Sequence, residues 1–290
     1  MTRVYPDYYP RFRCIGGDCR HNCCIGWEID IDEETLALYD GLDGELGDRL
    51  RRGISRTPEP HFVLGEGERC PFLNEHNLCD IITALGEEAL CDICAMHPRF
   101  CNETEERLEL GLGLCCEAAA RLILQNPNPV SLVGGDEGLR AAAIAAMQDR
   151  RLPIGQRLEQ VLAVCGVAVA DVAVERLLAL ERLDEAWTAR LQSLSRPVDR
   201  AAFDGYMAKR QTEYEQFAVY LLYRHFPTMG VAAGAFAVWA TRLLMALGAA
   251  QYAEMGVFTA DDQGELARLF SSEIEYSEEN LETVVEAICR

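Results

Sequence analysis

The sequence contains almost no lysine. Lys209 is the one lysine among 290 residues, and 27 basic residues in total face 47 acidic ones, for a net charge of −20. A chain this acidic binds nucleic acid or an anionic membrane surface poorly, because both carry negative charge themselves. We therefore expect no nucleic-acid partner. A basic or lysine-bearing partner is compatible with the charge, as is a plainly solvated acidic surface.

We expect neither a leader peptide nor a membrane span in this sequence. Residues 1–13 hold four aromatic residues and two prolines, which predicts an extended arm rather than the apolar run of a signal peptide. The most apolar stretch, residues 231–250, is long enough to span a membrane, but it contains Arg242 and lacks flanking basic anchors. We therefore expect a buried core helix there, no transmembrane segment, and a cytoplasmic location.

What the sequence has in abundance is cysteine, and it is concentrated in one region. Only Cys165 and Cys289 lie outside residues 14–116. The other eleven are Cys14, Cys19, Cys23, Cys24, Cys70, Cys79, Cys91, Cys94, Cys101, Cys115 and Cys116. A chain of this length can bury a sufficient core without covalent cross-links, so the clustering calls for a chemical explanation.

Three kinds of chemistry compete for these thiols: disulfides, structural zinc and an iron–sulfur cluster. Disulfides are disfavoured, because the total is odd, nothing in residues 1–13 suggests export, and the vicinal pairs Cys23–Cys24 and Cys115–Cys116 are strained as bridges. Zinc takes four ligands in a closed tetrahedron, and eleven thiols exceed that number. The spacing by itself does not decide between two metal sites and one cluster with spare thiols nearby.

Several separated segments resemble the flagellin lysine-N-methylase family, which is related to a wider group of cysteine-rich, zinc- or iron-chelating proteins. The segments are FRCIGGDCRHNCCIGWEIDID (12–32), CPFLNEHNLCDI (70–81), LGEEALCDICAMHPRF (85–100), LCCEAAARLIL (114–124), YEQFAVYLLYRHFP (214–227) and SSEIEYSEENLE (271–282). The resemblance covers nearly the whole chain. Two features depart from it: the chain is short for the family, and Tyr276 stands where the resemblance leads us to expect histidine.

The resemblance implies a metal-ligand set and two cofactors. The cysteines that match the family's are Cys14, Cys19, Cys23, Cys24, Cys70, Cys79, Cys94 and Cys116. By the same resemblance Cys91, Cys101 and Cys115 are additional thiols, the bound group is a [4Fe–4S] cluster, with zinc as the alternative, and the methyl donor is S-adenosyl-L-methionine.

The pattern of elements predicts a mainly α protein. We expect a small, metal-stabilised, cysteine-rich domain with a few short strands over residues 1–126, packed on a helical bundle over 127–290, with the proline-rich joint at 126–129 between them. The predicted helices lie at 136–150, 154–169, 170–194, 199–226, 231–254, 261–270 and 277–289. A strand at 26–31 and a β-hairpin over 99–114 complete the prediction.

Gly111-x-Gly113, at the end of that hairpin, is the one glycine pattern suggestive of a nucleotide site. A Rossmann-type methyltransferase places its glycine-rich turn inside repeated βα units, and no such alternation is present here.

Two functions follow as hypotheses. The first is a protein-lysine N-methyltransferase that uses S-adenosyl-L-methionine, carries a cysteine-ligated iron–sulfur cluster and acts on flagellin or a similar surface protein. The second is a non-enzymatic zinc- or iron-chelating protein with a helical partner-binding domain. Methyl transfer to lysine requires a neutral amine, and no side chain stands out in the sequence as its catalytic base.

Overall fold

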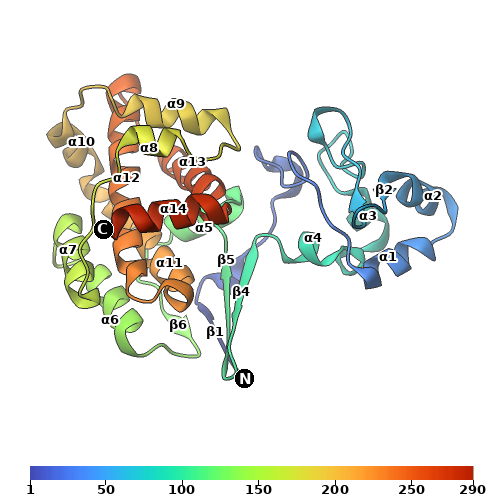
Figure 1. Ribbon diagram of the computed structural model, residues 1–290, viewed down its shortest axis with the longest axis horizontal. Coiled ribbons are helices and arrows are strands. Elements are labelled where there is room, and N and C mark those ends of the chain that lie inside the picture. The colour runs from blue at the N-terminus through green and yellow to red at the C-terminus, as the bar shows by residue number, and fades with distance from the viewer. Residues whose placement is uncertain (290) are drawn as a thin grey trace. The chain divides into compact units, whose positions relative to one another are not determined.

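The computed structural model describes residues 1–289, and their contacts divide the chain into two compact units. The cysteine unit is Arg13–Phe100, and the helical unit is Met1–Phe12 together with the chain from Cys101 onward. The cysteine unit contains α1 to α4, and the helical unit contains α5 to α14 (Figure 1). Within the described residues the chain is mainly α-helical with a few short strands, as predicted.

The cysteine unit consists of short elements joined by long loops. They are α1 (Glu33–Asp40), α2 (Gly44–Gly53), β2 (Ile54–Ser55), β3 (His61–Phe62), α3 (Asp80–Leu85) and α4 (Asp92–Met96). Asp32 caps α1 by accepting a hydrogen bond from the Thr35 amide, and the helix ends at the glycines that follow it. The unit has a hydrophobic core of its own, to which Tyr39, Phe62 and Phe72 contribute.

The predicted strand at 26–31 is wrong. This segment makes only single bridges, Ile25 with Arg69 and Asp30 with His61, and continues as a loop. Its alternating pattern is explained by burial, because Ile29 and Ile31 both point into the core of the cysteine unit.

A four-stranded sheet is formed by segments far apart in the sequence. It has the order β4-β5-β1-β6, made of β1 (Thr2–Pro6), β4 (Arg99–Glu103), β5 (Arg107–Leu112) and β6 (Leu132–Val133). The hairpin of β4 and β5 was predicted. β1 runs parallel to β5, with Val4 opposite Glu109, and antiparallel to β6. This sheet is not a doubly wound βα sheet, in agreement with the argument against a Rossmann fold.

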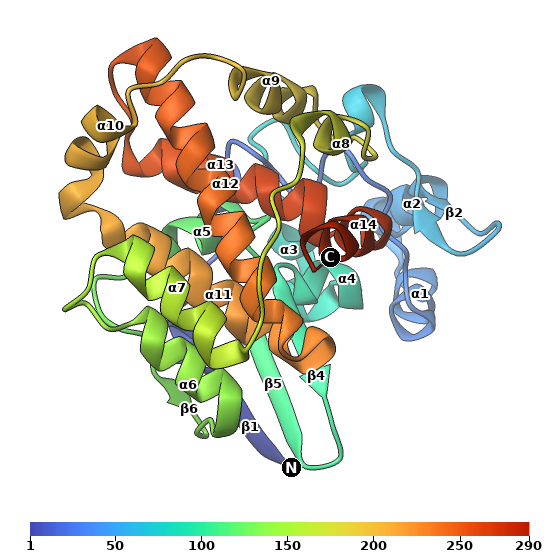
Figure 2. The ribbon, with the colours of Figure 1, turned by 60° about the vertical axis from the view of Figure 1, so that its left-hand side comes forward.

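Helices make up the rest of the helical unit (Figure 2). They are α5 (Glu117–Leu124), α6 (Gly138–Met147), α7 (Ile154–Cys165), α8 (Val174–Leu178), α9 (Glu185–Ser193), α10 (Arg200–Tyr206), α11 (Gln211–Met229), α12 (Ala232–Met255), α13 (Ala260–Phe270) and α14 (Glu278–Ile288). Two predicted helices, 170–194 and 199–226, are each divided in two. Pro227 was expected to end α11 but lies within its last turn.

Helix α12 is the central helix of this unit. By length and composition it is the one helix in residues 1–289 that passes as a membrane span, but 78% of its most apolar window is buried inside the protein. Phe236 and Leu244 on this helix are fully buried against neighbouring helices. Its burial agrees with the predicted core helix and with the absence of a transmembrane segment.

The division of the chain differs from the predicted boundary between 1–126 and 127–290. The first strand and α5 both belong to the helical unit, because β1 pairs with β5 and β6. The proline-rich joint is also held within that unit, since the Gln216 side chain of α11 donates hydrogen bonds to the carbonyls of Asn126 and Asn128. The proline-rich segment therefore lies inside the helical unit and does not separate two units.

Candidate functional site: a thiol cluster and a buried polar network

Six cysteines of the cysteine unit lie close enough to affect one another's ionisation, and we call them the thiol cluster. They are Cys23, Cys24, Cys70, Cys79, Cys91 and Cys94. They come from three segments of the chain, separated by loops. Of the eight predicted metal ligands, five are members of this cluster.

Backbone hydrogen bonds join the segments that carry these thiols. The Cys70 amide donates to the Cys24 carbonyl at 2.8 Å, next to the bridge between Ile25 and Arg69. In the loop that follows Cys70, Leu73 makes a β-bridge with Cys79, and Cys79 is the N-cap residue of α3. These contacts fix one vicinal pair against two cysteines more than forty residues away in the sequence.

Cys91 and Cys94 are placed by α4. The Asp32 side chain, which caps α1 with one oxygen, accepts a hydrogen bond from the Asp92 amide at 2.9 Å with the other. Cys91 is fully buried and its thiol is hydrogen-bonded to that of Cys94. The resemblance left Cys91 aside as an additional thiol, whereas its two-residue spacing from Cys94 was the signal that the two act as a pair.

In each of the two hydrogen-bonded thiol pairs, one cysteine has a lowered pKa and the other a raised pKa. A hydrogen bond from Cys24 lowers the pKa of Cys23 to about 7, and one from Cys94 lowers the pKa of Cys91. The same hydrogen bonds, with burial, raise the pKa of Cys24 and Cys94. Burial raises the pKa of Cys70 to about 11. Metals bind the thiolate form, so a bound metal would have to displace protons from this cluster.

The remaining predicted ligands are Cys14, Cys19 and Cys116. Cys14 is exposed, and its sulfur accepts a hydrogen bond from the Gly16 amide, while the Cys19 thiol donates to the His21 carbonyl. Cys116 belongs to the helical unit, as do Cys101 and Cys115. Membership of the metal site stays a prediction for all three predicted ligands outside the cluster.

The donor chemistry of the cluster fits a soft metal or an iron–sulfur group, because thiolates are the preferred ligands of both. In residues 1–289, however, no group of three or more His, Cys, Asp or Glu side chains is already arranged to hold a metal ion. The six thiols lie near one another, but no three of them are arranged around a common metal position.

His97 lies at the edge of α4 and is not arranged as a ligand. Its ring contacts that of Trp27 edge-on at 5.9 Å, and the Trp27 indole donates a hydrogen bond to the Cys23 carbonyl. Burial, with the nearby Arg99, lowers the pKa of His97 to about 4, so the ring is neutral at physiological pH. This ring pair ties the Cys23 segment to the Cys94 segment.

The helical unit contains a second concentration of chemistry, a polar network buried between α11 and the π-helical turn Ser271–Glu275. The Glu275 carboxylate accepts a hydrogen bond from the Tyr220 hydroxyl at 3.0 Å, and His225 Nε2 lies 2.7 Å from its Oε1. The Arg224 guanidinium donates to the Tyr220 hydroxyl at 2.8 Å. Burial opposes ionisation of Glu275, but Arg224 and His225 outweigh it, and the pKa of Glu275 is lowered.

Tyr276 connects this network to the turn that carries Cys115 and Cys116. Arg224 lies 4.8 Å from the centre of the Tyr276 ring, and the Tyr276 hydroxyl is hydrogen-bonded to Arg224 and Cys115. A Cβ atom at Gly113 would lie 2.2 Å from that hydroxyl, so only glycine fits there. A tyrosine of the chain itself therefore occupies the space beside this glycine.

Sequence reasoning missed this network. Its members are spread over two segments about fifty residues apart, and each on its own is typical of an amphipathic helix. The available signal was that both segments, 214–227 and 271–282, belong to the stretches that carry the family resemblance.

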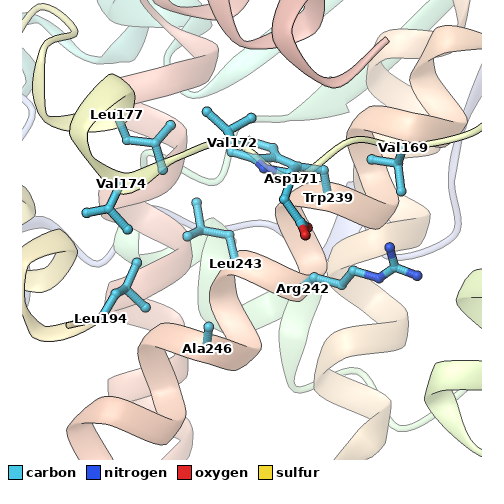
Figure 3. A pocket seen from close by; sticks show the side chains of 10 residues that line it. All are labelled: Val169, Asp171, Val172, Val174, Leu177, Leu194, Trp239, Arg242, Leu243 and Ala246. Atoms are coloured by element: carbon cyan, nitrogen blue, oxygen red, sulfur yellow. The ribbon is translucent and has the colours of Figure 1, made fainter. Parts of the chain in front are cut away.

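One surface pocket of about 210 Å³ lies beside α12 in the helical unit (Figure 3). Apolar side chains, among them Val174, Leu194 and Leu243, form most of its wall, with Asp171 and Arg242 at one end. The Arg242 guanidinium is paired with Glu159. Typical sites for small ligands enclose about 300–1,000 Å³, so this pocket is small for a whole nucleoside cofactor.

Comparison with known proteins finds similar sequences among proteins named as methylases. A lysine-N-methylase of Salmonella typhimurium is 30% identical over 139 residues, and one of Salmonella choleraesuis is 28% identical over the same length. The flagellar biosynthetic protein FliU of Salmonella muenchen is 27% identical over 139 residues. The chain is thus similar, over about half of its length, to proteins named lysine-N-methylase and FliU. This similarity agrees with the resemblance inferred from the sequence segments.

These matches cover part of each protein. They span 46% of this chain and 35% of each of the two lysine-N-methylases, but 82% of FliU. No protein-family model matches the sequence, and no solved structure matches the fold.

Proposed function

We propose that this protein is a protein-lysine N-methyltransferase. The observation that carries the proposal is the relation to proteins named lysine-N-methylase, together with the gathering of six thiols in the cysteine unit. The substrate we propose is flagellin or a similar surface protein, modified in the cytoplasm, and the methyl donor is S-adenosyl-L-methionine.

The proposed reaction moves one methyl group. The lysine nitrogen attacks the methyl carbon of the sulfonium, a C–N bond forms as the C–S bond breaks, and the thioether leaves as S-adenosylhomocysteine. The lysine must lose a proton before it can attack, because the ammonium form has no free electron pair. We do not place the whole methyl donor in the apolar pocket beside α12, because that pocket is too small for it.

The thiols of the cysteine unit would hold the cofactor. Cys23, Cys79, Cys91 and Cys94 are the residues of the cluster that we expect to contribute first, since they come from all three cluster segments. When bound, a [4Fe–4S] cluster would supply an iron able to exchange electrons or bind a donor ligand, whereas zinc would supply structure or Lewis acidity. The protein's own contribution is to hold the thiolates and shield them with the core around Cys91.

The test is methyl transfer by the full chain purified without oxygen. Labelled S-adenosyl-L-methionine is supplied with purified flagellin, and the labelled residues are located by peptide mass spectrometry. We expect label on flagellin lysines, loss of transfer in Cys94→Ser, and retention of transfer in Cys289→Ser, which removes an exposed thiol outside the cluster.

The alternative is a non-enzymatic zinc- or iron-chelating protein with a helical partner-binding unit. It is favoured by the thiols alone and by the absence of an identified base. A chain that binds metal stoichiometrically, yet transfers no methyl group to flagellin under any of these conditions, would support this alternative and contradict the methyltransferase.

A further inference from the structure

The pocket beside α12 is formed by segments of the helical unit that come together only in the folded chain (Figure 3). The residues of α12 that line it are spaced by three or four positions or less, which places them on one face of the helix: Trp239, Arg242, Leu243 and Ala246. The rest of the wall comes from the segment 169–174, from α8 and from the end of α9. The pocket therefore lies wholly within one compact unit.

The wall that faces α12 is anchored by hydrogen bonds to other elements of the unit. The Ala170 amide donates to the Ile288 carbonyl at the end of α14, at 2.9 Å. Arg182 donates to the Leu177 carbonyl of α8 at 3.3 Å and forms an ion pair with the buried Glu273. The pocket is therefore formed before any ligand arrives, and binding does not have to order the wall.

The polar end of the pocket has one uncompensated negative charge. The Arg242 guanidinium points away from the leucines of the wall and forms an ion pair with Glu159 of α7 (Figure 3). Asp171 is exposed, and within residues 1–289 its carboxylate has no hydrogen bond or ion pair. A cation is therefore favoured beside Asp171, and the net charge of −20 on the whole chain acts in the same direction.

A ligand that fits both parts of this pocket has an aliphatic body and one terminal cation. The lysine side chain has this form, because it is a stem of about four carbons that ends in a compact ammonium. The Trp239 ring in the wall adds a surface that attracts cations. The chain's one lysine, Lys209, does not line the pocket, so the occupant would come from another molecule.

We propose that this pocket binds a lysine side chain of a partner protein, with the aliphatic stem against the apolar face of α12 and the ammonium beside Asp171. That the bound lysine is the one to be methylated rests on the proposed function. The binding itself rests on the wall and the charge of the pocket.

The first experiment titrates the full chain with N-acetyl-lysine methylamide and follows the indole N–H signals of the tryptophans by NMR. The Trp239 signal is assigned by its absence in Trp239→Phe, and we expect it to shift with ligand concentration. Trp187 is fully buried and does not line the pocket, so its signal is the internal reference. The norleucine derivative, which lacks the ammonium, should bind about 2- to 5-fold more weakly, as for one exposed ion pair, and the glutamate derivative should cause no shift.

Three variants separate the charge from the cavity. Asp171→Asn should remove the preference for lysine over norleucine, because the attracting carboxylate is gone. Ala246→Leu extends a side chain into the cavity and should abolish the shift with both ligands. Glu137→Gln is the matched control, since Glu137 is an exposed carboxylate of the same unit outside the pocket, and it should bind lysine like the wild type. An unchanged Trp187 signal shows that each variant is folded.

Three results would overturn the proposal. They are no shift of the Trp239 signal with the lysine derivative, norleucine binding as tight as lysine binding, and an undiminished preference for lysine in Asp171→Asn.

Methyl transfer separates this proposal from the proposed function. A wild-type chain that binds the lysine derivative but methylates no flagellin contradicts the proposed function and leaves the pocket in place. Wild-type rates of flagellin methylation in folded Ala246→Leu would show that the methylated lysine does not enter this pocket, while the proposed function stands.

Discussion

At the scale of single residues, the chemistry of this protein lies in sulfur and in a few buried charges. Cys91 shows how a residue's role depends on its neighbours. Its thiol is buried, bonded to that of Cys94, and placed by the Asp32 contact at the start of α4. An exposed cysteine such as Cys101 has none of these constraints.

Replacement of Cys91 tests whether it is a member of the metal site. We expect Cys91→Ser to lower the metal bound per chain, because the hard hydroxyl is a poor ligand for a soft metal. Metal analysis of anaerobically purified protein is the measurement, with Cys101→Ser as the control that keeps full loading. Full loading in Cys91→Ser would return this residue to the role of an additional core thiol.

Gly113 tests the close approach of Tyr276. An added methyl group collides with the hydroxyl, so Gly113→Ala should destabilise the protein by about 1–3 kcal/mol, as overpacking does. The cost should be smaller in a Tyr276→Phe background, where that oxygen is absent. Urea unfolding of the four proteins of this double-mutant cycle gives the comparison, and equal costs in both backgrounds would show that the collision is relieved elsewhere.

The sequence indicated which cysteines are candidate metal ligands, but it did not indicate the role of each one. Five of the eight ligands implied by the family resemblance are in the thiol cluster. The resemblance left out Cys91, although its two-residue spacing from Cys94 indicated a pair. The Glu275 network was missed because its residues come into contact only when α11 packs against the π-helical turn.

At the scale of elements, most helices could be predicted because their apolar periodicity and caps are local signals. Ser277 caps α14 and Asp32 caps α1, each through its own side chain. Local signals failed where tertiary contacts decide. Residues 26–31 bury their isoleucines and meet β3 only through the single bridge of Asp30 with His61, and Pro227 is tolerated in α11 because the helix ends at Met229.

The contact between α7 and α12 depends on a small residue. A Cβ atom at Gly234 would lie 2.6 Å from the Cys165 sulfur, so Gly234→Ala should cost about 1–3 kcal/mol of unfolding free energy. Adding Cys165→Ala removes the sulfur and should restore part of the loss. Denaturant unfolding measures both, and no recovery in the double variant would mean that the helices separate for another reason.

The junction of α11 with the π-helical turn should give the protein an acid-sensitive contribution to stability. The pKa of Glu275 is lower in the folded protein than the ordinary value of about 4.3, so its ionisation favours the folded state above that value. This contribution is lost as the pH falls through the lowered folded pKa. Thermal unfolding of wild type and Glu275→Gln from pH 7 to pH 3 should show a stability difference that narrows on acidification, and a constant difference would contradict the ionised state.

At the scale of the whole molecule, the chain separates the two kinds of chemistry. Thiols are gathered in a small unit with its own core, and the buried charges and Tyr276 belong to a helical unit. The sequence predicted a cysteine-rich part and a helical part, but the unit boundaries depend on β1 pairing with β5 across a hundred residues, which no local pattern reveals.

The central claim is that the thiol cluster binds a cofactor for methyl transfer, and the most direct measurement is the iron and sulfide content of protein purified without oxygen, with its optical spectrum. We predict about four iron and four sulfide per chain, with absorption near 400 nm that bleaches in air. Replacement of Cys23 or Cys79 should lower both contents together. One or two zinc ions per chain without sulfide would contradict the cluster and leave a zinc-stabilised methylase or binding module as the account to pursue.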